Sequence, residues 1–397
     1  MTALPARLLP DILPAGGFRD WPSVTMVVAA LTAQGTAVRF VGGCVRDALL
    51  GHEPNDIDIA TPDQPQVVMA LAREAGLRVV PTGIDHGTVT VIADHQPVEV
   101  TTLRHDVETD GRRAVVAFTD DWAADALRRD FTINALYADP DGRLHDPVGG
   151  LADLAARHVR FIGRAVDRLA EDYLRALRFF RFHARFAEGP PDGEALAAIA
   201  DCRQALTRLS AERIASEVLK ILALRRALEA FGLMRDCGVL AVILPEAADF
   251  ARLERHVEGA DALLRLAALL PDEAEVGKAL ATRLRLSKAQ GARLAGALTP
   301  LPLAGGDACL RRLIHVAGRQ AVADRAVLQE RGALSARIEA LDVPEFPLRG
   351  ADLLAAGVPG GPAVGRLLAE LEEWWLDAGL LPDRDACLAE MRRRLKA

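Results

Sequence analysis

The hydrophobic pattern of this 397-residue chain changes its period part-way along the sequence. Between residues 36 and 102 short β-branched runs alternate with turns, and four of them predict strands: "AVRFVGG", "NDIDIAT", "GTVTVIA" and "QPVEVTTL". Helical patterns lie among these runs at 21 to 34 and 63 to 76. From about residue 120 onward, long Ala/Leu/Arg-rich segments have helical periodicity. The sequence predicts a small α/β head with a mixed sheet, followed by an elongated all-α neck, body and tail.

Clusters of proline and glycine interrupt the helical part and mark candidate joints. They are "GPPDG" (189 to 193), "TPLPLAGGD" (299 to 307) and "DVPEFPLRG" (342 to 350). We expect four regions: a catalytic head at 1–150, a neck at 151–225, a body at 226–300 and a tail at 301–397.

The composition predicts a protein with a well-filled core and no membrane segment. Half of the residues are hydrophobic and 26% are charged, and no apolar run reaches the roughly 20 residues that a bilayer span needs. The start, "MTALPARLLPDILPAGGF", has three prolines and lacks the apolar segment of a secretory signal, so we expect a cytoplasmic protein. The net charge of −7 argues against a basic surface overall, but the arginine-rich segment 157–185 leaves a nucleic-acid partner open.

The cysteines do not support a disulfide framework or a zinc site. They are odd in number, far apart and never in CxxC pairs, so we expect buried apolar fillers. They are Cys44, Cys202, Cys237, Cys309 and Cys387.

Two acidic residues in "NDIDIAT" form a candidate metal site. Asp56 and Asp58 are at i and i+2 of a predicted strand, so their side chains project from one face. Neighbouring carboxylates repel each other unless a cation lies between them, and hard oxygen ligands favour Mg²⁺. Glu99, a lone acid on another predicted strand, is the candidate third catalytic carboxylate. The alternatives are a solvated acidic loop and an exposed strand glutamate.

A glycine pair upstream of these acids forms a candidate phosphate site. Gly42 and Gly43 end a predicted strand, and "CVRDALLG" begins a short helix, which leaves backbone N–H groups where a triphosphate can bind. Arg46 can add a charge-assisted contact to phosphate oxygens. The segment matches neither the Walker pattern GxxxxGK[ST] nor the dinucleotide pattern GxGxxG.

Two later segments place polar groups on predicted helices. In "LRRDFTINALY" (127 to 137), Arg129 and Asp130 form a charged pair, and Asn134 follows Asp130 at i+4, so the three can share one face. In "EDYLRALRFFRF" (171 to 182), Asp172 and Arg175 are i and i+3 neighbours, and Arg178 and Arg181 continue that ridge. Taken alone, the second segment also fits an ordinary amphipathic helix with ion pairs.

The pair of Asp172 and Arg175 complements two of the four nucleobases. Cytosine and adenine both present an amino donor beside a ring-nitrogen acceptor, which a carboxylate and a guanidinium can bind together. Uracil and guanine present a carbonyl beside an N–H and would leave buried polar groups opposed, at a cost of several kcal/mol. The pair therefore predicts the use of CTP and ATP.

In this order, the motifs GG-x-x-RD, DxD, RRDFTxNA and EDxxRxxR resemble the nucleotidyltransferases related to DNA polymerase β. The resemblance is to the class II group of tRNA CCA-adding enzymes and bacterial poly(A) polymerases. It implies that Asp56 and Asp58 hold Mg²⁺ for catalysis, and that Arg129 contacts the nucleotide while Asp130 and Asn134 organise its sugar and the backbone. It also implies that the EDxxRxxR motif serves as a protein template for the base, and that the acceptor arm and 3′ end of tRNA are the partner.

Two further segments resemble motifs of the same family. The segment 146–163, "DPVGGLADLAARHVRFIG", resembles the third motif, for which the family implies a hinge. The segment 209–222, "LSAERIASEVLKIL", resembles the fifth motif, in which Ser210 has the position of a helix cap.

The resemblance leaves a choice of activity. Poly(A) polymerases of the group usually carry a basic-aromatic element after the DxD region, whereas this chain has "TGIDHGTVTVIADHQ" there, which favours CCA addition. Poly(A) synthesis is the alternative, and an RNA-binding protein with a lapsed active site is disfavoured by the intact Asp56 and Asp58. The sequence leaves open whether one chain adds both C and A, and whether the protein is a monomer or a homodimer.

Two other parts of the chain have family counterparts. The segment 103–122, polar at its start, is a candidate flexible loop, which in the family helps the switch from CTP to ATP. The region around His256 resembles an HD phosphohydrolase domain, but Pro271-Asp272 stands where a His-Asp doublet is needed. A phosphatase activity is therefore not expected.

Overall fold

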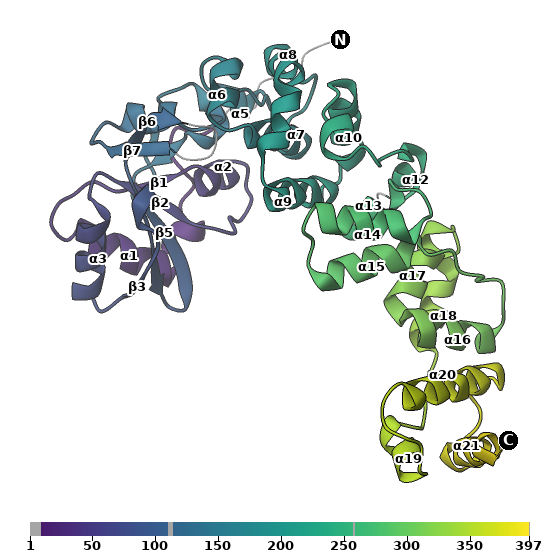
Figure 1. Cartoon of the computed structure of the whole chain (residues 1–397). Helices are drawn as coiled ribbons and strands as arrows, with labels where there is room; N and C mark the ends of the chain where they lie inside the picture. Colours follow the sequence, from purple (N-terminus) through teal and green to yellow (C-terminus); the bar gives the residue numbers. More distant parts are fainter. Residues whose placement is uncertain (1–8, 110–113, 257–258, 397) are drawn as a thin grey trace. The chain divides into compact units, whose positions relative to one another are not determined.

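A computed structural model of the chain describes residues 9–109, 114–256 and 259–396 (Figure 1). The described chain divides into two compact units, one ending at Leu244 and the other beginning at Pro245. This division falls inside the expected body region, and the four-region scheme remains a prediction. No described helix is both long and apolar enough to cross a membrane.

The first unit is built around a mixed seven-stranded sheet, as the sequence predicts. The strand order is β3-β4-β5-β2-β1-β8-β9. Strands β2 and β5 are parallel, and the other neighbours are antiparallel. The strands are β1 (Arg39–Val41), β2 (Asp58–Thr61), β3 (Arg78–Gly83), β4 (Thr88–Ala93), β5 (Gln96–Thr102), β8 (Tyr137–Ala138) and β9 (Leu144–His145).

The helices expected beside this sheet are present. Helix α1 (Pro22–Thr32) packs against β4 and β5, and α3 (Pro65–Glu74) packs against β3 and β4. Val27, Val89 and Val91 are fully buried here, so the β-branched runs provide the core between helices and sheet. The other helical elements of this part are η1 (Gly17–Asp20), α2 (Gly43–Leu49), η2 (Ile84–His86), α4 (Trp122–Leu127), η3 (Thr132–Asn134) and α5 (Gly150–Ala155).

The segment 103–122 forms more regular structure than a loop. Strands β6 (Arg104–Thr109) and β7 (Ala114–Phe118) pair as a two-stranded antiparallel sheet, and residues 110–113 lie outside the described part. The expectation of a loop is therefore wrong for the strands, because the backbones of β6 and β7 pair across the hairpin. The predicted mobility remains a hypothesis.

The rest of the first unit is helical. Helix α7 (Leu174–Phe186) packs against α9 (Ala211–Leu222) and α10 (Ala227–Asp236). The rings of Phe131 and Phe182, 5.1 Å apart between centroids, attach α7 to the segment that follows α4. The remaining elements are α6 (Ala165–Glu171), α8 (Gly193–Cys202), η4 (Arg203–Arg208) and α11 (Leu240–Ile243).

The second unit is entirely helical in its described part. In the region with the HD resemblance, the carboxylate of Asp272 is paired with Arg252 and Arg325, each at 2.6 Å. Its helical elements are α12 (Phe250–Arg255), α13 (Ala262–Ala268), α14 (Ala274–Arg283), α15 (Lys288–Leu298), α16 (Asp307–Ala317), α17 (Arg319–Leu328), η5 (Gly332–Leu334), α18 (Ser335–Ala340), α19 (Gly350–Ala355), α20 (Pro362–Asp377) and α21 (Arg384–Lys396).

The cysteines are all free thiols, and Cys44 and Cys387 are buried as expected. The other three are only half-buried, so the expectation of buried fillers is wrong for them.

Candidate active site

A polar hollow of about 490 Å³ brings together most of the residues that the sequence singles out. Arg128 and Phe182 also line it, although neither was expected to do so, whereas Glu99 and Arg181 do not. The lining residues are Gly42, Gly43, Arg46, Asp56, Asp58, Arg128, Arg129, Asp130, Asn134, Asp172, Arg175, Arg178 and Phe182.

The acidic pair lies at the start of β2. Only Asp58 belongs to the strand, because Asp56 lies in a bend before it, so the expectation of two residues on one strand is wrong for Asp56. Both carboxylates nevertheless line the hollow. Burial, together with the charges of Glu99 and Asp56, raises the pKa of Asp58 to about 6 against the opposing effect of Arg129. A carboxylate so disfavoured as an anion is one that a cation would stabilise.

The donor set fits a small hard cation. Neither Asp56 nor Asp58 has a side-chain hydrogen bond or ion pair with another described residue. No group of three or more His, Cys, Asp or Glu side chains suited to a metal occurs in the described part of the chain. Mg²⁺ is commonly bound by one or two carboxylates and completes its shell with water and substrate phosphates. Two unpaired carboxylates in an open polar hollow match that requirement.

Glu99 lies on strand β5, beside Asp58 on the neighbouring strand β2. The parallel register of β2 and β5 pairs Asp58 with Glu99, which places both side chains on the same face. Glu99 is exposed and does not line the hollow, and its charge contributes to the raised pKa of Asp58. Its role as a third carboxylate remains a prediction.

The glycine turn brings the backbone close to the segment after α4. Gly42 has a φ of 72°, a conformation that L side chains rarely adopt, and its N–H donates to the carbonyl of Leu136. A Cβ placed on Gly42 would lie 3.4 Å from the carbonyl oxygen of Asn134. Strand β1 ends at Val41 and helix α2 begins at Gly43, so the expectation that both glycines end the strand is wrong, whereas α2 is short, as predicted, with seven residues.

Arg46 makes more contacts with the protein than the sequence suggests. Its side chain is buried, its Nε donates to Asp47 at 2.8 Å, and its Nη1 donates to Asn134 at 2.5 Å. Its guanidinium also stacks over the ring of Phe186, 4.1 Å from the centroid. Arg46 therefore links α2, η3 and α7, in addition to lining the hollow.

The segment with Arg129, Asp130 and Asn134 is not the helix that its spacing predicts. Helix α4 ends at Leu127, and the chain passes through a turn before η3. The Nδ2 of Asn134 still donates to Asp130 at 3.0 Å, so the two groups meet as expected. The helix prediction is wrong because tertiary contacts dominate: Phe131 bridges to Phe161, and Asp130 pairs with Arg178 at 2.6 Å.

The charge on Asp130 is stabilised by these neighbours. Burial by itself raises the pKa of this carboxyl, but the guanidinium of Arg178 and the hydrogen bond from Asn134 hold its pKa below the usual range. Arg178 of α7 is thus attached to the segment after α4.

Asp172 lies in the corner between two helices. It follows α6 in an extended conformation, so it is not the helical i, i+3 neighbour of Arg175 that the sequence predicts. One carboxylate oxygen of Asp172 accepts from the backbone N–H of Leu174 at 3.0 Å, and the other pairs with Arg213 at 2.7 Å. Arg213 belongs to the fifth motif, where the sequence suggested only a helix start.

Arg175 is held from the other side of the same corner. Its Nη1 pairs with Glu171 and donates to the carbonyl of Arg168 at 3.1 Å, and its Nη2 donates to the carbonyl of Arg128 at 3.0 Å. Asp172 and Arg175 therefore line the hollow together, although each has its own partners. The pair of Arg175 with Glu171 at i, i+4 is local, whereas Arg213 and the carbonyl of Arg128 lie on other segments and could not be predicted from the helix pattern.

Arg181 does not line the hollow. Its Nε pairs with the buried Glu217 of α9 at 2.6 Å. The structure gives Arg181 a packing contact between α7 and α9, and its expected role at the nucleotide remains a prediction.

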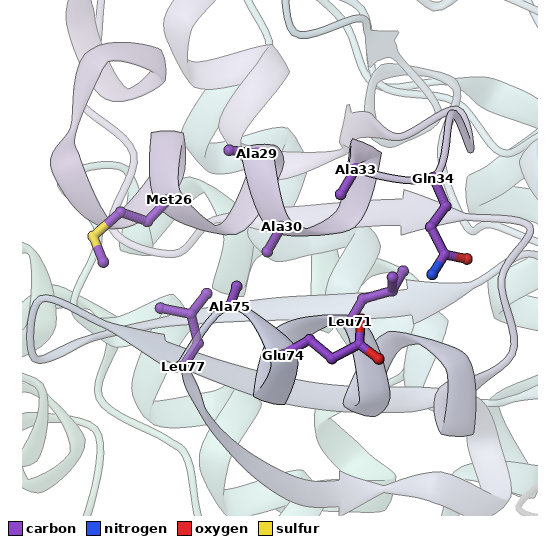
Figure 2. A pocket seen from close by; sticks show the side chains of 9 residues that line it. All are labelled: Met26, Ala29, Ala30, Ala33, Gln34, Leu71, Glu74, Ala75 and Leu77. Carbon is purple, nitrogen blue, oxygen red and sulfur yellow. The ribbon is translucent and has the colours of Figure 1, made fainter.

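A second hollow has the same volume as the polar hollow but a lining of different chemistry. It lies between α1 and α3 (Figure 2) and has the same volume of about 490 Å³. Its walls are mainly apolar, formed by alanines with Met26, Leu71 and Leu77, and Glu74 is its one acidic side chain. A triphosphate with a metal ion would find no cationic group there, so the polar hollow is the candidate site.

Family models match two parts of the chain. Residues 38–160 match the model described as poly A polymerase head domain, and residues 191–250 match the one described as probable RNA and SrmB-binding site of polymerase A. The mitochondrial CCA tRNA nucleotidyltransferase 1 of Mus musculus is 36% identical over 378 residues, covering 90% of this chain and 86% of the relative. The chain belongs to the CCA tRNA nucleotidyltransferase family.

Other members of the CCA tRNA nucleotidyltransferase family support the same assignment. The CCA-adding enzyme of Lactobacillus gasseri is 30% identical, with 92% of this chain and 95% of the relative covered. The crystal structure of the Bacillus stearothermophilus CCA-adding enzyme in complex with CTP superposes with a TM-score of 0.72 at 26% identity, covering 93% of this chain and 96% of that one. The predicted fold class and the family resemblance are confirmed.

Proposed function

We propose that this nucleotidyltransferase adds or repairs the 3′-terminal CCA of tRNA, using CTP and ATP without a nucleic-acid template and releasing pyrophosphate. The observation that carries the proposal is the composition of the polar hollow. The hollow is lined by two carboxylates without a protein partner, those of Asp56 and Asp58, and also by the carboxylate of Asp172 and the guanidinium of Arg175. The first pair suits phosphoryl chemistry, and the second suits base recognition.

On the acidic side, Asp56 and Asp58 would hold Mg²⁺. When bound, the metal lowers the pKa of the attacking 3′-hydroxyl of tRNA and neutralises charge on the α-phosphate and the leaving pyrophosphate. The backbone of Gly42 and Gly43 and the guanidinium of Arg129 position the triphosphate for in-line attack. Asp130 and Asn134, which are bonded to each other, support the sugar side.

On the helical side, Asp172 and Arg175 have bonding capacity left for a base. A carboxylate can accept about four hydrogen bonds, and each oxygen of Asp172 has one protein partner. A guanidinium has five N–H donors, and three hydrogen bonds from Arg175 to the protein are described. The remaining acceptor and donor can bind the amino group and the ring nitrogen of cytosine or adenine. Uracil and guanine would oppose like groups, and we propose that they are rejected for that reason.

The tRNA partner is expected to bind the helical part of the chain through its backbone and shape. The match of residues 191–250 to an RNA-binding model supports this proposal. Exposed arginines in that range, such as Arg203 and Arg208, can contact phosphates. We propose a cytoplasmic location for this chain; its relative from Mus musculus is named as mitochondrial.

One incubation tests the activity. The purified chain is combined with Mg²⁺, both CTP and ATP, one of which is labelled, and a tRNA that lacks its CCA end, with a tRNA already ending in CCA and reactions with UTP and GTP as controls. Addition of three nucleotides to the truncated tRNA alone is the expected result. A long A-tail would instead indicate a poly(A) polymerase, and a complete lack of incorporation with intact tRNA binding would indicate an RNA-binding protein.

A further inference from the structure

A buried carboxylate next to the hollow binds two arginines at once. Asp125 of α4 is only 1% exposed and does not itself line the hollow. Its Oδ1 accepts from Nε and Nη2 of Arg128 at 2.8 and 2.6 Å. Its Oδ2 accepts from Nη2 of Arg129 at 3.0 Å and from the hydroxyl of Tyr137 at 2.7 Å. One negative charge therefore serves two guanidinium groups, and a net positive charge remains at the edge of the hollow.

These contacts take up one edge of the Arg129 guanidinium. Its Nη2 is bonded to Asp125, and its Nε donates to the hydroxyl of Tyr137 at 3.2 Å. Its Nη1 makes no hydrogen bond with any described residue, and a Cβ built on Gly42 would lie 3.6 Å from it. The free edge of Arg129 is thus turned to the glycine turn at the hollow, and the opposite edge is fixed.

The protonation states of the two partners support this arrangement. Burial by itself raises the pKa of Asp125, but the charges of Arg129 and Arg128 and the hydrogen bond from Tyr137 lower it to about 2. Burial raises the pKa of Tyr137 above its usual value. At neutral pH Asp125 is therefore the ionised acceptor and Tyr137 the neutral donor.

We infer that Asp125, assisted by Tyr137, is a positioning residue that aims the free edge of Arg129 at the triphosphate of the incoming nucleotide. The inference rests on the proposed function and adds to it a group that does not touch the substrate. The same carboxylate fixes the side chain of Arg128, whose carbonyl accepts a hydrogen bond from Arg175. It also accepts from the backbone N–H of Arg104, the first residue of β6, at 3.3 Å.

A purely structural role for Asp125 is the alternative to a positioning role. A buried carboxylate with two cationic partners can matter for folding alone, because removing it leaves charges unpaired. A positioning role makes a separate prediction: without Arg129, loss of Asp125 has no further consequence for nucleotide binding. A double-mutant cycle measures that coupling.

The test measures equilibrium binding of CTP to the full chain with Mg²⁺ and without tRNA. The variants are Asp125→Asn, Tyr137→Phe and Arg129→Ala, together with each of the first two combined with the third. We expect Asp125→Asn and Arg129→Ala each to weaken CTP binding by roughly 10- to 100-fold, the range for a hydrogen bond to a charged group. On the Arg129→Ala background, Asp125→Asn and Tyr137→Phe should change binding by less than about 2-fold.

Asp153→Asn is the matched control. Asp153 is also buried and bonded to an arginine, Arg160, but it does not line the hollow or contact Arg129. Any effect it has on CTP binding should be equal in the two backgrounds. Thermal unfolding of every variant identifies those that do not fold, and if Asp125→Asn is one of them, Tyr137→Phe carries the test.

Additive losses for Asp125 or Tyr137 with Arg129 would overturn the inference, and so would unchanged CTP binding in Asp125→Asn. These results can be distinguished from a failure of the proposed function, because CTP binding is measured separately from nucleotide incorporation. A chain that shows the coupling but adds no nucleotide to tRNA would contradict the function and leave the positioning role in place.

Discussion

The two sides of the polar hollow differ in how their charges are compensated. On the acidic side, the carboxylates of Asp56 and Asp58 have no protein partner among the described residues. On the helical side, Asp172 is paired with Arg213, Arg175 with Glu171 and Arg178 with Asp130. Burial without a protein partner raises the pKa of Asp58, so a cation would stabilise its anion, whereas the paired side chains are already held in place. We therefore propose that the acidic side receives a cation, whereas the helical side presents fixed hydrogen-bonding groups.

The largest loss of activity is expected on the acidic side, from the replacement of Asp58. Asp58→Ala should lower nucleotide incorporation by about 1,000-fold or more, because a carboxylate that holds the metal supports several kcal/mol of transition-state stabilisation. Binding of tRNA, measured by gel shift, should stay within about 2-fold, since Asp58 has no protein partner to lose. Asp94→Asn, at an exposed acid in the turn between β4 and β5, is the control and should leave both unchanged. Loss of folding in Asp58→Ala would show a structural aspartate instead.

Glu99→Gln tests how far the acidic side extends. If Glu99 acts as the third carboxylate, incorporation should fall by about 100-fold with little change in the melting temperature, because the side chain is exposed. Single-turnover rates at saturating CTP measure this loss. A change of only a few-fold would show that Glu99 is not a third catalytic carboxylate and affects Asp58 only as its neighbour in the sheet.

Asp172→Asn addresses the helical side. An amide in place of the carboxylate can turn its donor toward the base, so discrimination should fall by about 10-fold or more when kcat/KM for CTP is compared with that for UTP. The matched control is Asp167→Asn, an acid on the first turn of the adjacent α6 that does not line the hollow. Unchanged selectivity in Asp172→Asn would remove the base-reading role from this residue.

The smallest effect is expected from the partner of Asp172. Arg213→Ala should reduce kcat/KM for CTP by only a few-fold, because the ion pair is about one-third exposed on the arginine side and is screened by water. The loss should be partly recovered in Arg213→Lys, which keeps the charge. A loss as large as that of Asp172→Asn would mean that Arg213 itself contacts the nucleotide or the tRNA.

Much of the candidate site can be predicted because its residues lie in short motifs. The Asp56 and Asp58 pair, the Gly42 and Gly43 pair, and the Asp172 and Arg175 pair each lie within a few positions of the sequence. Spacing and residue type are sufficient to suggest a metal, a phosphate and a base there. The same local reasoning fails for Asp130, which lies in a turn rather than on a helix, and it does not predict that Arg181 pairs with Glu217. In both cases a tertiary ion pair took precedence over the local pattern.

The sequence by itself determined the two-part architecture, the order of the motifs and the chemistry that they can perform, because periodicity and residue type are local properties. Only the tertiary structure decided which charges remain free. Arg46 meets Asn134 across 88 positions, Arg178 meets Asp130 across 48, and Asp172 meets Arg213 across 41. Such partners depend on how the sheet, the turn after α4 and the neck helices pack together. That packing holds most of the charged groups in the hollow with protein partners and leaves Asp56 and Asp58 without one.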